Sequence, residues 1–255
     1  MIPLSDEHTT LRPPVMTYAI IAANVLTWLV VQGAGFNEPA LAASVCNFGM
    51  VPGELTHLAP LGSGVPLGDG MACIVDNEAI NRLTPLTSMF LHGSWMHLIF
   101  NMLYMWVFGN NIEDSMGSVR FLAFYIICGL AASAAHILVG PSSPVPTVGA
   151  SGAISGVMGA YLVLYPRIRV RMFIPPFFLI RIRAWLVLLW WIFGQLLSGL
   201  PALSSMRPDV SSGVAFWAHI GGFVAGLVLV KVFENRALVA ERAVPRDLSA
   251  GPGFP

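Results

Sequence analysis

The fourth of six apolar stretches opens with the run that decides the fold, Gly149-Ala-Ser-Gly-Ala-Ile-Ser-Gly-Val-Met-Gly159. Its small residues recur every four positions on more than one face of a helix, so a second helix can approach the backbone closely. The sixth stretch carries Ala218, Gly222 and Gly226 at the same spacing. We therefore predict direct packing of these two helices. The glycines expected at the contact are Gly152, Gly156, Gly222 and Gly226.

The composition around this run is that of a membrane protein. Hydrophobic residues make up 56% of the 255 residues and charged residues only 10%, whereas charged residues approach about a quarter of a soluble domain. This excludes an ordinary soluble enzyme, a disordered chain and a nucleic-acid binder. The six apolar stretches are near the length that a helix needs to span a bilayer. They run over residues 15–31, 95–108 (or from as early as Leu86), 119–139, 151–165, 184–197 and 214–233.

Basic residues predict the orientation of the spans, because cytoplasmic loops retain Lys and Arg. With the N-terminus inside, the outer side holds only Arg82 and Arg207. The inner side collects Arg12, Arg120, Arg167, Arg169, Arg171, Arg181, Arg183, Lys231, Arg236, Arg242 and Arg246. We therefore expect an all-α six-helix membrane bundle with both termini in the cytoplasm.

The same pattern divides the chain into segments. Residues 1–14 form a cytoplasmic N-terminal segment, residues 15–233 the membrane domain and residues 234–255 a disordered cytoplasmic tail. The outer loop 32–85 is rich in Gly and Pro and is expected to be irregular. Cys46 and Cys73 both lie in this loop and are candidates for a disulfide. The inner stretch 167–183, apolar and basic in alternation, is interpreted as an interfacial hairpin held by anionic lipid headgroups.

Polar residues inside apolar helices are costly and are usually functional. The second, fourth and sixth spans run from outside to inside, so residues near their N-terminal ends share the outer half of the bilayer. His97, Asn101, Ser151 and His219 therefore lie at similar depth. His136 has no such partner and is expected to be structural. For each residue alone, a hydrogen bond between helices is the alternative role.

This cluster suggests nucleophilic catalysis. A serine hydroxyl needs a base, and neutral His219 can act on Ser151 if the two helices meet. His97, Asn101 and the Ser151 amide are candidate donors to an oxyanion. All 13 carboxylates lie outside the spans, and only Asp209 in the outer loop is even near. The residues thus predict a Ser-His dyad without metal or cofactor.

These residues resemble the rhomboid intramembrane serine proteases. His92-Gly-Ser-Trp-Met-His97-Leu-Ile-Phe-Asn101 is similar to the family's HxxxxHxxxN segment, Gly149-Ala-Ser-Gly152 to its GxSG motif, and Ala218-His-Ile-Gly-Gly222 to its AHxxG. The resemblance covers residues 82–233 and fits the six-span bacterial form. It implies Ser151 as nucleophile and His219 as base. It also implies Gly149, His97 and Asn101 on the oxyanion side, a structural role for His92, and a water-filled cavity open to the outer face of the bacterial inner membrane.

Two positions depart from the family pattern. Ser155 stands where members often have an aromatic residue that stacks on the base, so we expect the base to be held less rigidly. The loop 32–85 also lacks the Trp-Arg pair that many members carry.

The resemblance implies substrates that are single-span membrane proteins cut near their outer juxtamembrane region. A helical segment must unwind before its peptide bond can be attacked, which favours spans with Gly, Pro or polar residues. The alternative function is a catalytically inactive relative that binds membrane proteins. A transporter is disfavoured because the spans contain no acid, and HExxH zinc and GxGD aspartyl chemistries are excluded by the missing motifs. Membrane lipids are expected partners and nucleic acid is not, and the oligomeric state stays open.

Overall fold

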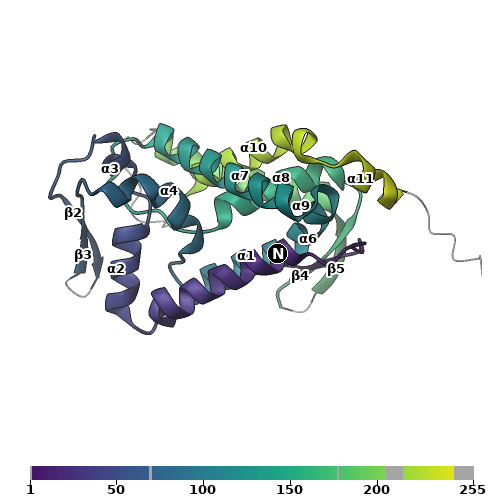
Figure 1. Ribbon diagram of the computed structural model, residues 1–255, viewed down its shortest axis with the longest axis horizontal. Helices are drawn as coiled ribbons and strands as arrows, with labels where there is room; N and C mark the ends of the chain where they lie inside the picture. The colour runs from purple at the N-terminus through teal and green to yellow at the C-terminus, as the bar shows by residue number, and fades with distance from the viewer. Residues whose placement is uncertain (1, 69–70, 177, 205–214, 244–255) are drawn as a thin grey trace, which may run out of the picture.

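The computed structural model describes residues 2–68, 71–176, 178–204 and 215–243 (Figure 1). In chain order the elements are β1 (Ile2–Asp6), α1 (Val15–Leu26), η1 (Thr27–Val31), η2 (Gly33–Gly35), α2 (Glu38–Phe48), α3 (Pro52–Thr56), β2 (Gly64–Gly68), β3 (Met71–Ile74), η3 (Ala79–Leu83), α4 (Thr84–Thr87), η4 (Ser88–Phe90), α5 (Trp95–Tyr104), η5 (Met105–Gly109), α6 (Asn110–Met116), α7 (Ser118–Val139), α8 (Ser151–Leu164), β4 (Arg169–Ile174), β5 (Phe178–Arg183), α9 (Ala184–Ser204), α10 (Phe216–Phe233) and α11 (Arg236–Ala243).

Helix α8 forms the centre of the bundle and packs against α7 and α10. Its residues are buried without interruption from Gly152 to Tyr161. A Cβ on Gly222 would overlap the carbonyl oxygen of Gly152, and a Cβ on Gly226 would overlap that of Gly156. The backbones of α8 and α10 therefore touch, and the predicted glycine contact is confirmed.

The six predicted apolar stretches are helical wherever the structure describes them, apart from the end residues Tyr165 and Ala215. By length and hydropathy, α7 and α10 could each cross a membrane, and shorter apolar helices cover Val15–Val31, Ser151–Leu164 and Ala184–Leu200. The second stretch does not begin as early as Leu86. Instead, short helical turns and an extended segment lead to Ser94. The Ser94 hydroxyl accepts a hydrogen bond from the His97 amide and so caps the N-terminus of α5, which begins at Trp95.

The Glu113 carboxylate connects the start of the first apolar stretch with the helix that follows the second stretch. Glu113 on α6 accepts hydrogen bonds from the backbone amides of Met16 and Thr17, which belong to the first turn of α1. It also accepts from the hydroxyls of Thr17 and Ser118. The first amides of a helix lack acceptors within the helix, so Glu113 stabilises the N-terminus of α1 from another element.

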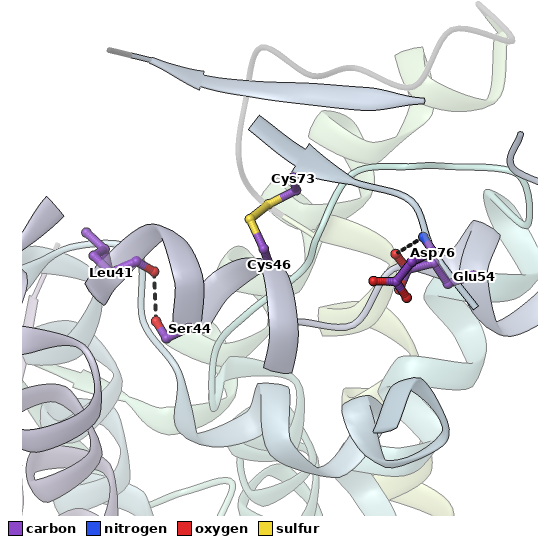
Figure 2. The surroundings of a disulfide bond; sticks show 6 residues. All are labelled: Leu41, Ser44, Cys46, Glu54, Cys73 and Asp76. Atoms are coloured by element: carbon purple, nitrogen blue, oxygen red, sulfur yellow. Dashed lines mark hydrogen bonds between the residues drawn. A yellow bond between two sulfur atoms is a disulfide. The ribbon is translucent and has the colours of Figure 1, made fainter. Parts of the chain in front are cut away.

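The segment between the first two spans is more regular than predicted. It contains α2, α3 and the antiparallel hairpin β2–β3, and it lies at one end of the long axis (Figure 1). The two candidate cysteines, Cys46 and Cys73, do pair: the disulfide joins α2 to β3 across 27 residues (Figure 2). Near it, the buried carboxylate of Glu54 accepts a hydrogen bond from the Asp76 amide at 3.3 Å. The Gly and Pro content of residues 32–85 predicted irregular structure. Composition does not contain the disulfide or the pairing of β2 with β3, which order this segment.

The opposite end carries a three-stranded antiparallel sheet in the order β1-β4-β5 (Figure 1). The predicted hairpin over 167–183 is confirmed as β4–β5, and β1 from the N-terminal segment adds a strand that the sequence did not predict. Val170 pairs with Ile182 and faces the core. Since Arg169 pairs with Arg183 and Arg171 with Arg181, four exposed arginines share the other face. We call these residues the arginine face.

The start of the predicted disordered tail is helical. Helix α11 packs against α6, the Asn235 amide donates to the Ser115 carbonyl at 2.9 Å, and Glu241 forms an ion pair with Arg12. The expectation of disorder is therefore wrong over Arg236–Ala243, because these contacts with preceding elements hold the helix. Residues 244–255 lie outside the described part.

Candidate active site

The N-terminus of α8 brings a serine against a histidine of α10. The distance between Ser151 Oγ and His219 Nε2 is 2.7 Å. His219 is nearly buried, and Ser151 is half-buried at the start of its helix. The glycine contact described above explains the geometry, because Gly152 and Gly222 each lie within one turn of the pair. The sequence prediction that these two side chains meet agrees with this arrangement.

Both side chains line a cavity of about 600 Å³, which also receives His97, Asn101 and Gly149. The five predicted site residues therefore come from α5, α8, α10 and the loop before α8. This volume lies in the range of small-molecule and peptide side-chain sites. The cavity gives Ser151 a space in which a second reactant can approach.

The ring of His97 borders the space beside Gly149 with one nitrogen. Its Nδ1 accepts a hydrogen bond from the Gly93 amide at 3.4 Å. A neutral imidazole that accepts at Nδ1 carries its proton on Nε2. A Cβ built on Gly149 would lie 2.8 Å from His97 Nε2 and 3.4 Å from Ser151 Oγ. The space beside Gly149 is thus bounded by a donor and by the Ser151 hydroxyl oxygen, and it is open because residue 149 has no side chain.

Gly149 also has a backbone conformation that requires glycine. Its φ is +134°, and its amide donates to the Ser88 carbonyl at 2.9 Å. A side chain at this position would be strained as well as obstructive. The conformation directs the chain into α8, where the first backbone amides, including that of Ser151, lack acceptors within the helix.

Asn101 lies one helical turn after His97 on the same face of α5. Its side chain is 6% exposed, and its Nδ2 has no hydrogen-bond partner among the described residues. A buried amide without an acceptor is costly. A reactant oxygen in the cavity could satisfy it, which matches the predicted oxyanion side.

Two residues of α9 that the sequence analysis did not identify also meet His219. Gln195 Oε1 is 2.7 Å from His219 Nδ1, and the ring of Trp191 is centred 5.7 Å from the His219 ring. The sequence held a signal for the first of them, because Gln195 is the only amide or charged side chain in the apolar stretch 184–197. Besides Ser151, His219 therefore has two neighbours on α9.

The other polar candidates take different places. His92 is fully buried, its ring meets the edge of the His97 ring, and its backbone amide and carbonyl both bond to the Gln32 side chain. His136 Nε2 lies 3.1 Å from Thr147 Oγ1, in line with its expected structural role. Ser155 donates to the Ser151 carbonyl. Asp209 lies outside the described residues.

The comparisons with known proteins identify the family of the chain and agree with a helical membrane bundle. The model of the Rhomboid domain family matches residues 81–236. The chain therefore belongs to the rhomboid family, whose members are helical membrane bundles.

Its relatives include the Rhomboid protease GluP of Bacillus subtilis (34% identical, 58% of this chain and 24% of the relative). Rhomboid protein 1, mitochondrial, of Saccharomyces cerevisiae is 31% identical over 38% of this chain and 29% of the relative. RHOMBOID-like protein 6, mitochondrial, of Arabidopsis thaliana is 32% identical over 58% of this chain and 50% of the relative. The chain thus spans between a quarter and half of the length of these relatives.

Proposed function

We propose that the protein is an intramembrane serine endopeptidase that hydrolyses peptide bonds in or near transmembrane segments. The observation that carries this proposal is the contact between Ser151 and His219, in a cavity and across two helices whose backbones touch. The name of one relative, Rhomboid protease GluP, supports the same chemistry.

In the proposed reaction, Ser151 Oγ attacks the substrate carbonyl carbon while its proton passes to His219 Nε2. The C–N bond then breaks, and His219 returns that proton to the leaving amine. Water, deprotonated in turn by His219, hydrolyses the resulting ester and frees Ser151. The arrangement needs no group beyond the side chains and water, which the cavity has room to admit.

The developing oxyanion would occupy the space beside Gly149. His97 Nε2–H borders that space, and Asn101 Nδ2 and the Ser151 amide are further donors. One such donor is commonly worth about 3 to 4 kcal/mol in the transition state. Asn101 enters this role without giving up another hydrogen bond, because its Nδ2 has no partner among the residues described.

We also propose that the chain crosses the membrane six times with both termini in the cytoplasm of a bacterial cell, and that the cavity opens to the outer face. The disulfide-bonded segment and the arginine face lie at opposite ends of the molecule (Figure 1). Disulfides persist in oxidising compartments, whereas arginines concentrate on the cytoplasmic side. In this orientation the arginine face meets the headgroups of anionic lipids.

The proposed substrates are single-span membrane proteins with a helix-weakening residue near the outer end of the span. A carbonyl in a regular helix is already hydrogen-bonded, so local unwinding must precede attack. The alternative is an inactive family member that binds membrane proteins. It would keep the cavity but would not need the contact between Ser151 and His219.

Cleavage by the purified protein in liposomes that contain a single-span substrate tests the proposal. Ser151→Ala and His219→Ala should each abolish cleavage and labelling of residue 151 by a fluorophosphonate. Ser115→Ala is the matched control, because this buried helix serine bonds only to the Ile112 carbonyl through its hydroxyl. Its activity should equal that of the wild type. Cleavage that survives in Ser151→Ala would refute the assignment and favour a contaminating protease.

A further inference from the structure

Gln195 reaches the base from a helix that carries neither the nucleophile nor the base. It lies on α9, and its Oε1 is 2.7 Å from His219 Nδ1, on the side of the ring opposite Ser151. The rest of the apolar stretch 184–197 carries no amide or charged side chain. A half-buried polar group in such a span needs a partner, and this one has it in His219.

The two hydrogen bonds of the ring fix its protonation pattern. For Ser151 to be activated, His219 Nε2 must accept the hydroxyl proton, so the single proton of the neutral ring lies on Nδ1. Oε1 faces Nδ1 in this structure, and because an amide oxygen can only accept a hydrogen bond, this orientation of Gln195 is compatible with the Nδ1–H tautomer. With Ser151 on one nitrogen and Gln195 on the other, the ring plane is also fixed.

We propose that Gln195 is a positioning residue that holds His219 in the Nδ1–H tautomer and in the orientation needed to deprotonate Ser151. The inference rests on the proposed protease function and extends it from two residues to three. In Ser-His-Asp triads a buried carboxylate performs this task. Here a neutral amide does so without the large cost of burying a charge in an apolar helix.

Trp191 supports the same arrangement from one turn earlier on α9. Its ring packs against His219 and also against Phe223 of α10. Ser155, on the α8 side of the cavity, leaves the imidazole without an aromatic neighbour at that position. The aromatic contact that position 155 does not supply therefore comes from Trp191 of α9. The base is thus held by a helix separate from the α8–α10 pair.

Kinetics of three variants test the role of the amide. Gln195→Leu removes the acceptor at similar volume and should lower kcat about tenfold, the loss expected for one neutral hydrogen bond, with little change in KM. Gln195→Glu restores an acceptor oxygen and should recover most of the rate. Phe193→Leu, at an exposed position of the same helix, should behave as the wild type. Wild-type kcat in Gln195→Leu, or equal impairment in Gln195→Glu, would overturn the inference.

A spectroscopic measurement separates this inference from the proposed function. In protein labelled with ¹⁵N-histidine, the wild type should show His219 as the Nδ1–H tautomer above the pH at which the ring is protonated. Gln195→Leu should shift the population toward Nε2–H. This readout needs no turnover, so a protein that cleaves nothing but shows the shift would refute the protease assignment alone. The same tautomer mixture in both proteins would refute the role of Gln195.

Discussion

Replacing Gly226 by alanine would place one methyl group where α10 touches α8. The Cβ would overlap the carbonyl oxygen of Gly156 and crowd the Gly156 Cα as well. These are backbone atoms, so no side chain can rotate away. The helices would have to separate by about 1.5 Å to reach an ordinary contact distance.

The separation predicts a loss of stability and a larger loss of activity. Overpacking of this kind costs about 1 to 3 kcal/mol. Gly226 is seven residues, or about 10 Å, along α10 from His219. Part of the displacement would therefore reach the 2.7 Å contact between Ser151 and His219. Misplacement of reacting groups by about 1 Å can lower turnover 100-fold, so a reduction of 10- to 100-fold is expected.

The assay compares Gly226→Ala with Gly194→Ala. A Cβ on Gly194 of α9 meets nothing within 4 Å, so this control adds the same methyl group in open space. Thermal unfolding in detergent gives the stability change, and cleavage of a single-span substrate with fluorophosphonate labelling of Ser151 gives the activity change. The melting temperature and the cleavage rate of the wild type in both variants would refute the direct contact between the backbones of α8 and α10.

Three further predictions concern other parts of the molecule. Gly149→Ala should abolish cleavage yet leave substrate binding measurable, because the methyl group would fill the space between His97 Nε2 and Ser151 Oγ at a φ of +134°; near-normal kcat would contradict the placement of the oxyanion there. Replacing Cys46 and Cys73 together by serine should destabilise the segment that contains α2 and β3 by about 3.5 kcal/mol, the chain-entropy value for a 27-residue separation. Hydrogen exchange of β3 amides would measure this loss, and unchanged exchange would rule out the stabilisation. Burial, with the charges of Asp76 and Glu78 adding to it, raises the pKa of Glu54 above its ordinary value of 4.5, so the folded state binds this proton more tightly than the unfolded chain and stability should rise as the pH falls from 7 toward 4.5. Glu54→Gln should remove that part of the pH dependence of thermal unfolding, whereas Glu38→Gln at an exposed position should not; identical profiles for both variants would contradict the burial effect.

Sequence periodicity and hydropathy predicted the helices of the bundle because a span must satisfy its backbone internally and present an apolar surface. They did not predict β1, whose five residues become a strand only by pairing with β4, more than 160 positions away. Helix α11 depends in the same way on contacts with α6. Elements stabilised by distant partners leave little trace in their own composition.

The site was predictable as far as its motifs extend. Ser151, His219, His97 and Asn101 could be grouped from spacing and depth. Gly149 was added by the family resemblance, and the structure brings all five to one cavity. Gln195 was missed because it belongs to none of the three motifs, and because the rotation of α9 about its axis depends on packing. Trp191 was missed because one tryptophan among many apolar residues carries no signal.

The bond network of Glu113 has a consequence for biogenesis. The amides of Met16 and Thr17 find their acceptor only after almost one hundred further residues have been synthesised. Until then they depend on water, which keeps the leading end of the first span at the aqueous boundary while the following segments leave the ribosome. When α6 docks, the Glu113 carboxylate replaces that water at the two amides. We therefore expect the first helix to take its final position late in assembly.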